Sequence, residues 1–303
     1  MSKRCFGCLL AAVFGLITMS AAHAQIFVAN LGNNTIGEYN ADGSTANASL
    51  VSSGLAHPYG IAVSGSDLFV VNDTSGVIGE YTTSGATVNA SLVTGLNHPY
   101  GIAASGSDLY VSIYDGESIG EYTTSGGTVN ASLVTGLSGP TGVAVSGSDL
   151  FIVNSANNTI GEYTLSGGTV NASLVTGFSG PVDIAVSGSD LFVGSDDSGT
   201  IGEYTTSGET VNASLITGLN GPTGIAVVGS DLFVANNYGD TIGEYTTSGG
   251  TVNASLISGL DEPEGIVVES VPEPSTWVLL LGGLSLPVFW WVRKQNRRAR
   301  HNV

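Results

Sequence analysis

The residues best placed to do chemistry are two histidines and several tyrosines in the middle of the chain. His57 and His98 fall in adjacent repeats, and each stands two residues before a tyrosine. Tyrosine rings stack on sugars, and their hydroxyls donate and accept hydrogen bonds, so this combination suits a carbohydrate site. The predicted ligand-binding residues are His57, Tyr59, His98, Tyr100, Tyr114 and Tyr238.

Aspartates recur in the same polar segments and indicate a second kind of chemistry. Carboxylate oxygens gathered without neighbouring cations favour Ca²⁺ or Mg²⁺ over softer metals. Turn propensity alone also places aspartate in loops, so the sequence leaves both interpretations open. The candidate calcium ligands are Asp73, Asp115, Asp183, Asp196 and Asp240.

Charge is distributed very unevenly along the chain. Residues 25–270 hold 24 of the 25 acidic residues and none of the seven Lys and Arg residues. Such a segment cannot neutralise a phosphate backbone, which excludes a nucleic-acid partner. Both cysteines, Cys5 and Cys8, precede it, so it has neither disulfides nor a thiol nucleophile. No nucleophile and base stand at a recognisable spacing, and we assign no catalytic residue.

The N-terminus has the pattern of a secretory leader. Lys3 and Arg4 precede an apolar run, and small residues follow it up to Ala24. A basic start, an apolar centre and an A-x-A ending predict a signal peptide over residues 1–24 and export through the Sec pathway.

The C-terminus predicts a membrane anchor. A 17-residue uncharged stretch, 276–292, is bounded by tryptophans and followed by five basic residues. That length is near the short limit for a spanning helix, and the basic tail places the C-terminus in the cytoplasm. The central segment is then expected outside the cytoplasm, anchored to the inner membrane. A short motif precedes the stretch: Val271, Pro272, Glu273 and Pro274.

Motif, apolar span and arginine-rich end together resemble the PEP-CTERM sorting signals of Gram-negative bacteria. The resemblance covers residues 271–303 and implies an exosortase-type sorting enzyme as a partner. It also implies an association with exopolysaccharide or biofilm, and release to the cell surface or extracellular matrix if the signal is cleaved.

Between the two ends, one unit of about 41 residues is repeated six times. The triplet Gly-Glu-Tyr begins at residues 37, 79, 120, 161, 202 and 243. Each period contains four short apolar runs separated by Gly, Ser, Asn, Asp and Pro, a pattern typical of strands joined by turns. Four strands per repeat predict one propeller blade, so the expected fold is an all-β six-bladed β-propeller over residues 25–270.

The first and last strands show how the ring closes. The run from Ile26 matches the second strand of a repeat, and the run from Gly265 matches the first. One blade is therefore expected to combine N- and C-terminal strands, which protects the sheet edges. The unit resembles the NHL repeat, through Pro58 to Val63 and Pro222 to Val227. The usual Asp after the second strand is Asn in four copies, and the basic residues of such repeats are absent.

Comparing the copies separates two sets of connections. The turns between first and second strands and between third and fourth strands hardly change, whereas the other two connections differ from copy to copy. Chain reversal places the variable connections on one rim of the propeller. We expect a ligand there, around the central channel, because binding residues gather in loops on a rigid scaffold.

Two functions fit these features. The first is a non-catalytic, envelope- or matrix-associated binding module for extracellular polysaccharide or another envelope component. The alternative is a divalent-metal-dependent hydrolase or lactonase resembling gluconolactonase-type propellers, with His57 or His98 as general base. That family uses a converging Glu, Asn and Asp set, which cannot be identified in this sequence.

Overall fold

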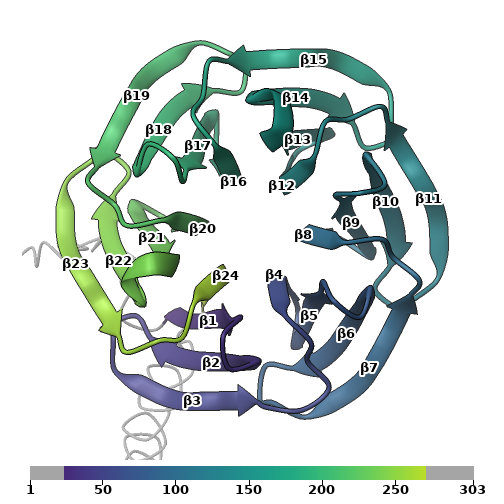
Figure 1. Cartoon of the computed structure of the whole chain (residues 1–303), viewed down its shortest axis with the longest axis vertical. Helices are drawn as coiled ribbons and strands as arrows, with labels where there is room; N and C mark the ends of the chain where they lie inside the picture. The colour runs from purple at the N-terminus through teal and green to yellow at the C-terminus, as the bar shows by residue number, and fades with distance from the viewer. Residues whose placement is uncertain (1–23, 271–303) are drawn as a thin grey trace, which may run out of the picture.

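The computed structural model describes residues 24–270, which form six four-stranded antiparallel sheets around a central axis (Figure 1). The predicted six-bladed fold is confirmed. Within the described residues no helix is long and apolar enough to cross a bilayer. The leader before Ala24, the motif at 271–274 and the apolar stretch at 276–292 lie outside these residues.

The innermost strand of every blade begins with a proline. A proline at the first position of a strand costs no ladder hydrogen bond. These strands surround the axis in Figure 1: β4 (Pro58–Ser64), β8 (Pro99–Ser105), β12 (Pro140–Ser146), β16 (Pro181–Ser187), β20 (Pro222–Val228) and β24 (Pro263–Ser270).

The second strands are the most buried part of the molecule. They read as continuous apolar runs because neighbouring blades cover both faces. They are β1 (Ala24–Asn30), β5 (Asp67–Asn72), β9 (Asp108–Ile113), β13 (Asp149–Asn154), β17 (Asp190–Ser195) and β21 (Asp231–Asn236).

The third strands carry the Gly-Glu-Tyr triplet. In β6 the glycine is required because a Cβ on Gly79 would lie 2.8 Å from the buried ring of Tyr81. The Tyr81 hydroxyl donates a hydrogen bond of 3.0 Å to the Gly54 carbonyl. These strands are β2 (Thr35–Asn40), β6 (Val77–Thr82), β10 (Ser118–Thr123), β14 (Thr159–Thr164), β18 (Thr200–Thr205) and β22 (Thr241–Thr246).

The outer strands are largely exposed and contain the Asn-Ala-Ser sequence of each repeat. In β7 the Asn89 side chain accepts a hydrogen bond of 3.1 Å from the Ser91 amide, where the register with β6 shifts. The outer strands are β3 (Thr45–Val51), β7 (Thr87–Thr94), β11 (Thr128–Thr135), β15 (Thr169–Thr176), β19 (Thr210–Thr217) and β23 (Thr251–Ser258). Two short 3₁₀ turns, η2 (Ser155–Asn157) and η3 (Asn237–Gly239), follow β13 and β21.

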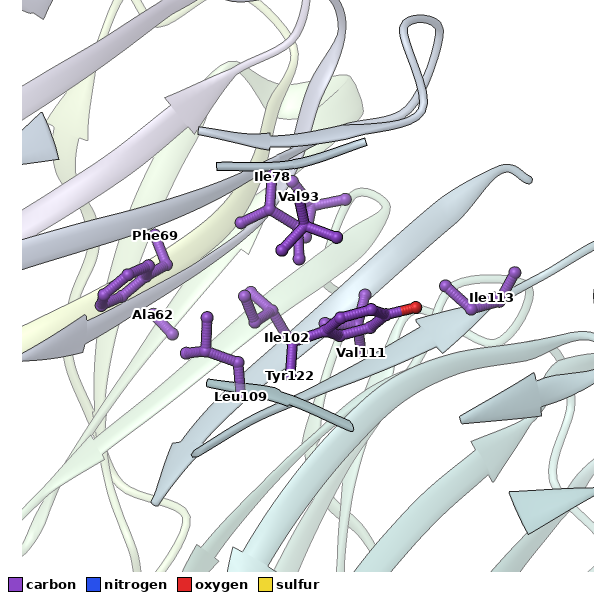
Figure 2. Close-up of a cluster of buried hydrophobic side chains, with 10 residues drawn as sticks. Ala62, Phe69, Ile78, Val93, Ile102, Leu109, Val111, Ile113 and Tyr122 are labelled. Atoms are coloured by element: carbon purple, nitrogen blue, oxygen red, sulfur yellow. The ribbon is translucent and has the colours of Figure 1, made fainter. Parts of the chain in front are cut away.

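The core lies between blades rather than inside them. Figure 2 shows one such cluster, in which Phe69 and Ile78 of one blade pack with Ile102, Leu109 and Val111 of the next. Five further clusters of the same kind join the remaining blade pairs. Each blade therefore depends on both neighbours for its buried surface.

The ring closes as expected. Strand β24 pairs antiparallel with β1, with Val268 opposite Ile26 and Ile266 opposite Val28. Strand β1 also includes Ala24, which is buried and pairs with Ser270, so the sheet begins at the last residue of the predicted leader. N- and C-terminal strands share one blade and leave no open sheet between the ends of the ring.

The two sets of connections lie on opposite rims. On the variable rim, the Asp73 amide donates a hydrogen bond of 3.1 Å to the His57 carbonyl, which joins the exit of β5 to the entry of β4. On the other rim, the Thr83 amide donates a bond of 2.8 Å to the Ser66 carbonyl. The chain reversal inferred from sequence is confirmed.

Candidate functional site at the channel mouth

The entries to the six inner strands divide the variable rim into two halves. Three adjacent blades enter with His57-Pro-Tyr59, His98-Pro-Tyr100 and Glu262-Pro-Glu264. The other three enter with Gly-Pro-Thr or Gly-Pro-Val, beginning at residues 139, 180 and 221. Because β24, β4 and β8 are neighbours (Figure 1), the residues that depart from the glycine pattern form one continuous arc. We use the name active arc for the six residues that stand directly before and after the prolines of these three blades: His57, Tyr59, His98, Tyr100, Glu262 and Glu264.

Backbone conformation makes the active arc costly to maintain. The residue before the proline has positive φ in every blade, and in three blades it is glycine. In the arc this position holds His57 at φ 53°, His98 at 51° and Glu262 at 51°. A side chain in the left-handed region costs roughly 1–2 kcal/mol relative to glycine. Three such residues side by side indicate that their side chains serve a purpose other than stability.

The tyrosines of the arc are in contact. The rings of Tyr59 and Tyr100 have centroids 4.3 Å apart at 37°, and Tyr114, in the turn after β9, lies 6.4 Å from Tyr100. Tyr59 and Tyr100 line a cavity of about 250 Å³ at the channel, together with Asp183, Thr223 and Glu264. The cavity therefore has an aromatic side and a carboxyl side.

Glu264 is the buried carboxyl group of the arc. Its side chain is 9% exposed, and its Oε1 accepts a hydrogen bond of 2.9 Å from the Asn237 side-chain amide. Burial raises the pKa of Glu264 to about 8, and the charges of Asp196, Glu262 and Asp183 add to this rise. The group can therefore hold or release a proton near neutral pH.

Asp183 occupies a position that is glycine in the other five inner strands. Its Oδ2 accepts a hydrogen bond of 2.9 Å from the Ile225 amide of the next blade. Burial raises the pKa of Asp183 to about 6, although hydrogen bonds from the Ile225 and Ile184 amides oppose the rise. Space for the side chain comes from Gly142 in the inner strand of the preceding blade, where a Cβ would lie 2.8 Å from Asp183 Oδ1.

His98 is held between two aspartates. Its Nδ1 lies 2.9 Å from Asp73 Oδ1, and its Nε2 lies 3.6 Å from Asp115 Oδ2. His98 thus bridges the turn after β5, which holds Asp73, and the turn after β9, which holds Asp115. His57 is exposed, and its backbone amide donates a bond of 2.7 Å to Asn34 Oδ1.

The five aspartates proposed as calcium ligands do not form one cluster. Asp73 and Asp115 flank His98, and Asp183 lies in the channel. Asp196 accepts a 3.4 Å hydrogen bond from the Tyr238 hydroxyl, and Asp240 ends η3, where it accepts the Glu262 amide at 3.1 Å. Within residues 24–270 no three His, Cys, Asp or Glu side chains come together in a metal-binding arrangement. The calcium site remains a prediction without a common ligand set in the described part of the chain.

Comparison with known families supplies a name for this architecture. A model of the virginiamycin B lyase family matches residues 17–280, which is most of the chain. The chain belongs to this family. A search of curated proteins found no match.

Solved structures show the family fold in several settings. A structure of a nidogen/laminin complex matches with a TM-score of 0.70 and 15% identity, over 82% of this chain and 98% of that chain. Streptogramin B lyase matches at 0.58 and 20%, over 81% and 78%. A catalytically inactive histidine-to-alanine variant of virginiamycin B lyase from Staphylococcus aureus, with quinupristin, matches at 0.56 and 21%, over 80% and 78%. At these identities the structural likeness extends to the fold alone.

In this member of the virginiamycin B lyase family, the structure brings together part of the residue set predicted from the sequence. Tyr59, Tyr100 and Tyr114 lie close to one another, and His98 lies between two of the aspartates that were predicted as calcium ligands. His57 and Tyr238 lie on the same rim, but within residues 24–270 neither side chain is hydrogen-bonded to Tyr59 or Tyr100. Glu262 and Glu264 were missed as site residues. Aligning the six inner-strand entries would have found both, because only one blade carries acidic residues directly before and after the proline.

Proposed function

We propose that this propeller is a binding module that recognises an extracellular polysaccharide or envelope component at the active arc. The observation that carries the proposal is the departure of three adjacent blades from glycine at strained positions, together with the paired tyrosines behind them. Among the six inner-strand entries, these three consecutive blades alone replace the glycine before the proline, and they do so at a position of positive φ. Tyrosine faces and carboxyl groups beside a cavity suit a sugar ring.

The extracytoplasmic localisation proposed from the two ends of the chain agrees with such a role. A signal peptide at residues 1–24 and a PEP-CTERM-like signal at 271–303 would deliver the propeller across the inner membrane to an exosortase-type enzyme. Fractionation of the producing cells and mass determination of the exported form test this. A mature protein that begins near Gln25 supports export, and a mass lacking the residues beyond the motif supports sorting.

Reversion of the arc tests the binding proposal. Glu262→Gly with Glu264→Thr gives that blade the entry found in two other blades, so the variant is expected to fold. His57→Gly with Tyr59→Thr does the same for the next blade. We expect both full-length variants to lose retention on a glycan array that the unaltered chain shows. Retention unchanged in both would contradict the proposed site.

A second function is catalysis of the kind named in the family. The observation that favours it is Glu264, a buried carboxyl group beside the cavity whose pKa of about 8 suits proton transfer near neutral pH. Incubation of the full chain with quinupristin, followed by mass spectrometry, tests a lyase reaction. Turnover by the unaltered chain that disappears in Glu264→Gln would establish Glu264 as the acid–base group. If the unaltered chain binds glycans but shows no turnover, the lyase function is rejected and the binding function stands.

A further inference from the structure

The aromatic side of the channel mouth is built from two adjacent blades. Tyr59 comes from β4, Tyr100 from β8 and Tyr114 from the turn after β9, with centroid separations of 4.3 and 6.4 Å. The rings are tilted by 37° in both pairs, so they form a curved surface rather than a flat stack. Tilted tyrosine faces attract a cation placed within about 6 Å of the ring centroids.

Carboxyl groups lie beside this aromatic surface. Glu264 and Asp183 line the same cavity as Tyr59 and Tyr100. Burial raises the pKa of the Tyr59 hydroxyl to about 12, and the charges of Glu264, Asp73 and Glu262 raise it further despite a hydrogen bond to Tyr100. Burial also raises the pKa of Glu264 to about 8, so this carboxyl group is largely protonated at neutral pH and negatively charged above about pH 8. A cation that enters would meet the ring faces together with these carboxyl groups, and it would favour the ionised form of Glu264.

No positive side chain of the central segment competes for the site. Residues 25–270 contain no Lys or Arg, and His98 is already placed between Asp73 and Asp115. The innermost strands of the propeller also contain a buried hydroxyl group without a hydrogen-bond partner. Thr141, in the blade next to Tyr100, is 3% exposed and its Oγ1 makes no hydrogen bond, whereas the equivalent Thr223 donates at 2.9 Å to the Pro263 carbonyl.

The cavity limits the size of the group that enters. About 250 Å³ is below the range of about 300–1,000 Å³ typical of sites for drug-sized ligands. One sugar residue or one amine headgroup fits this description better than an extended chain. Val182 and Thr223 line the same cavity and are smaller than the tyrosines at the equivalent positions of the arc.

We propose that the channel mouth binds an organic ammonium group, carried either by an amino-sugar residue or by a small free amine. This inference rests on the proposed binding function and names the chemistry of its ligand. The tyrosine surface would receive the cation on the ring faces, with the Glu264 carboxyl group beside it in the same cavity.

The test compares cationic probes with neutral ones of the same shape. Calorimetric titration of the full chain with choline and with 3,3-dimethylbutan-1-ol isolates the charge, and glucosamine against N-acetylglucosamine does the same on a sugar. We expect each cation to bind about tenfold more tightly than its neutral partner. If only choline binds, the ligand is a small amine, and if only glucosamine binds, it is an amino sugar. Equal binding of the charged and neutral probes overturns the inference.

Variants separate the site from general attraction by an acidic protein. Tyr59→Leu is expected to weaken cation binding about tenfold, whereas Tyr59→Phe, which keeps the ring face, should change it by less than about threefold. In choline titrations above about pH 8, where the Glu264 carboxyl group is ionised, Glu264→Gln should weaken binding. Glu209→Gln, which removes a carboxylate from an exposed turn, should not. If Glu209→Gln weakens binding equally, the attraction is diffuse and the site assignment fails.

The outcomes also distinguish this inference from the function on which it rests. If neutral glycans bind and this binding is lost when the arc is reverted, the binding function is supported and the ammonium ligand is refuted. No binding of any probe, with arc reversion leaving glycan-array retention unchanged, would refute both.

Discussion

His57 is held at φ 53° although three other blades use glycine at the same position. Within the described residues its side chain makes no hydrogen bond that would offset this cost. Replacing His57 by Gly relieves a strain of roughly 1–2 kcal/mol but adds backbone entropy to the unfolded chain. We expect a net gain of about 1 kcal/mol in the free energy of unfolding, measured by urea denaturation.

The matched control is the reverse change in the glycine half of the ring. Gly139 has φ 57°, and a Cβ there would lie 3.1 Å from both Ala156 Cβ and the Tyr114 ring. Gly139→Ala should therefore lower the free energy of unfolding by about 1–2 kcal/mol. A stability loss in both variants would show that His57 is structural rather than retained for binding.

Glu264 predicts a dependence of stability on pH. Its pKa rises from an ordinary 4.5 to about 8 on folding, so the folded chain holds the proton more tightly. The group favours the folded state fully below about pH 4.5, and this contribution is lost as the pH rises to about 8. We expect the free energy of unfolding to fall by several kcal/mol across this window.

Glu264→Gln isolates that contribution. Glutamine retains an oxygen for the Asn237 amide and cannot ionise, so the variant should keep its stability between about pH 6 and 8, where the unaltered chain loses it. Asp183, whose pKa is raised to about 6, titrates in both proteins and affects the acidic end equally. Parallel curves for the two proteins above pH 6 would contradict the assignment.

At the scale of single residues, sequence reasoning identified types but not burial. The tyrosines and His98 stood out because they interrupt a near-identical repeat. The burial of Glu264 depends on packing at the closure of the ring, where β24 meets β20 and β4, and no local pattern reports it. The same applies to Asp183, whose side chain occupies space left by Gly142 in the inner strand of the preceding blade.

At the scale of the elements, the inner strands must approach one another closely to form a narrow channel. The Pro-x-Gly pattern makes this possible, because a Cβ on Gly101 would lie 2.4 Å from the Thr141 carbonyl oxygen of the next blade. Sequence predicted each strand from its apolar run and flanking turns. It did not predict the register shifts between inner and second strands, since these depend on contacts between blades.

Gly101→Ala tests this role of the inner strands. The added methyl group must displace backbone rather than a flexible side chain, so we expect a loss of about 2–3 kcal/mol in the free energy of unfolding. A suitable control is Gly106→Ala, at a turn on the opposite rim, where nothing lies within 4 Å of the new Cβ. Gly106 has φ 61°, so its replacement by alanine should lower the free energy of unfolding only by the conformational cost of roughly 1–2 kcal/mol. A Gly101→Ala variant no less stable than the control would mean that the strands can separate.

At the scale of the whole molecule, closure of the ring depends on a strand that comes from the far end of the propeller sequence. Ile266 of strand β24 belongs to the same hydrophobic cluster as Ile26 and Val28 of β1. Phe233 of the preceding blade is also part of this cluster. It also carries Glu264, so closure and the active arc share one strand.

Two truncations separate closure from the segment that follows it. A chain ending after Ser270 keeps all 24 strands and is expected to unfold in one transition with unchanged midpoint. A chain ending after Glu262 lacks β24 and exposes the edge of β1 together with the apolar faces of both neighbouring blades, so it should lose cooperative unfolding and aggregate. Adding a synthetic peptide of residues 263–270 should restore part of the transition, because pairing of β1 with β24 buries Ile266 and Val268 without a covalent link. Cooperative unfolding of the shorter chain alone would mean that five complete blades suffice, and the site would then be independent of ring closure.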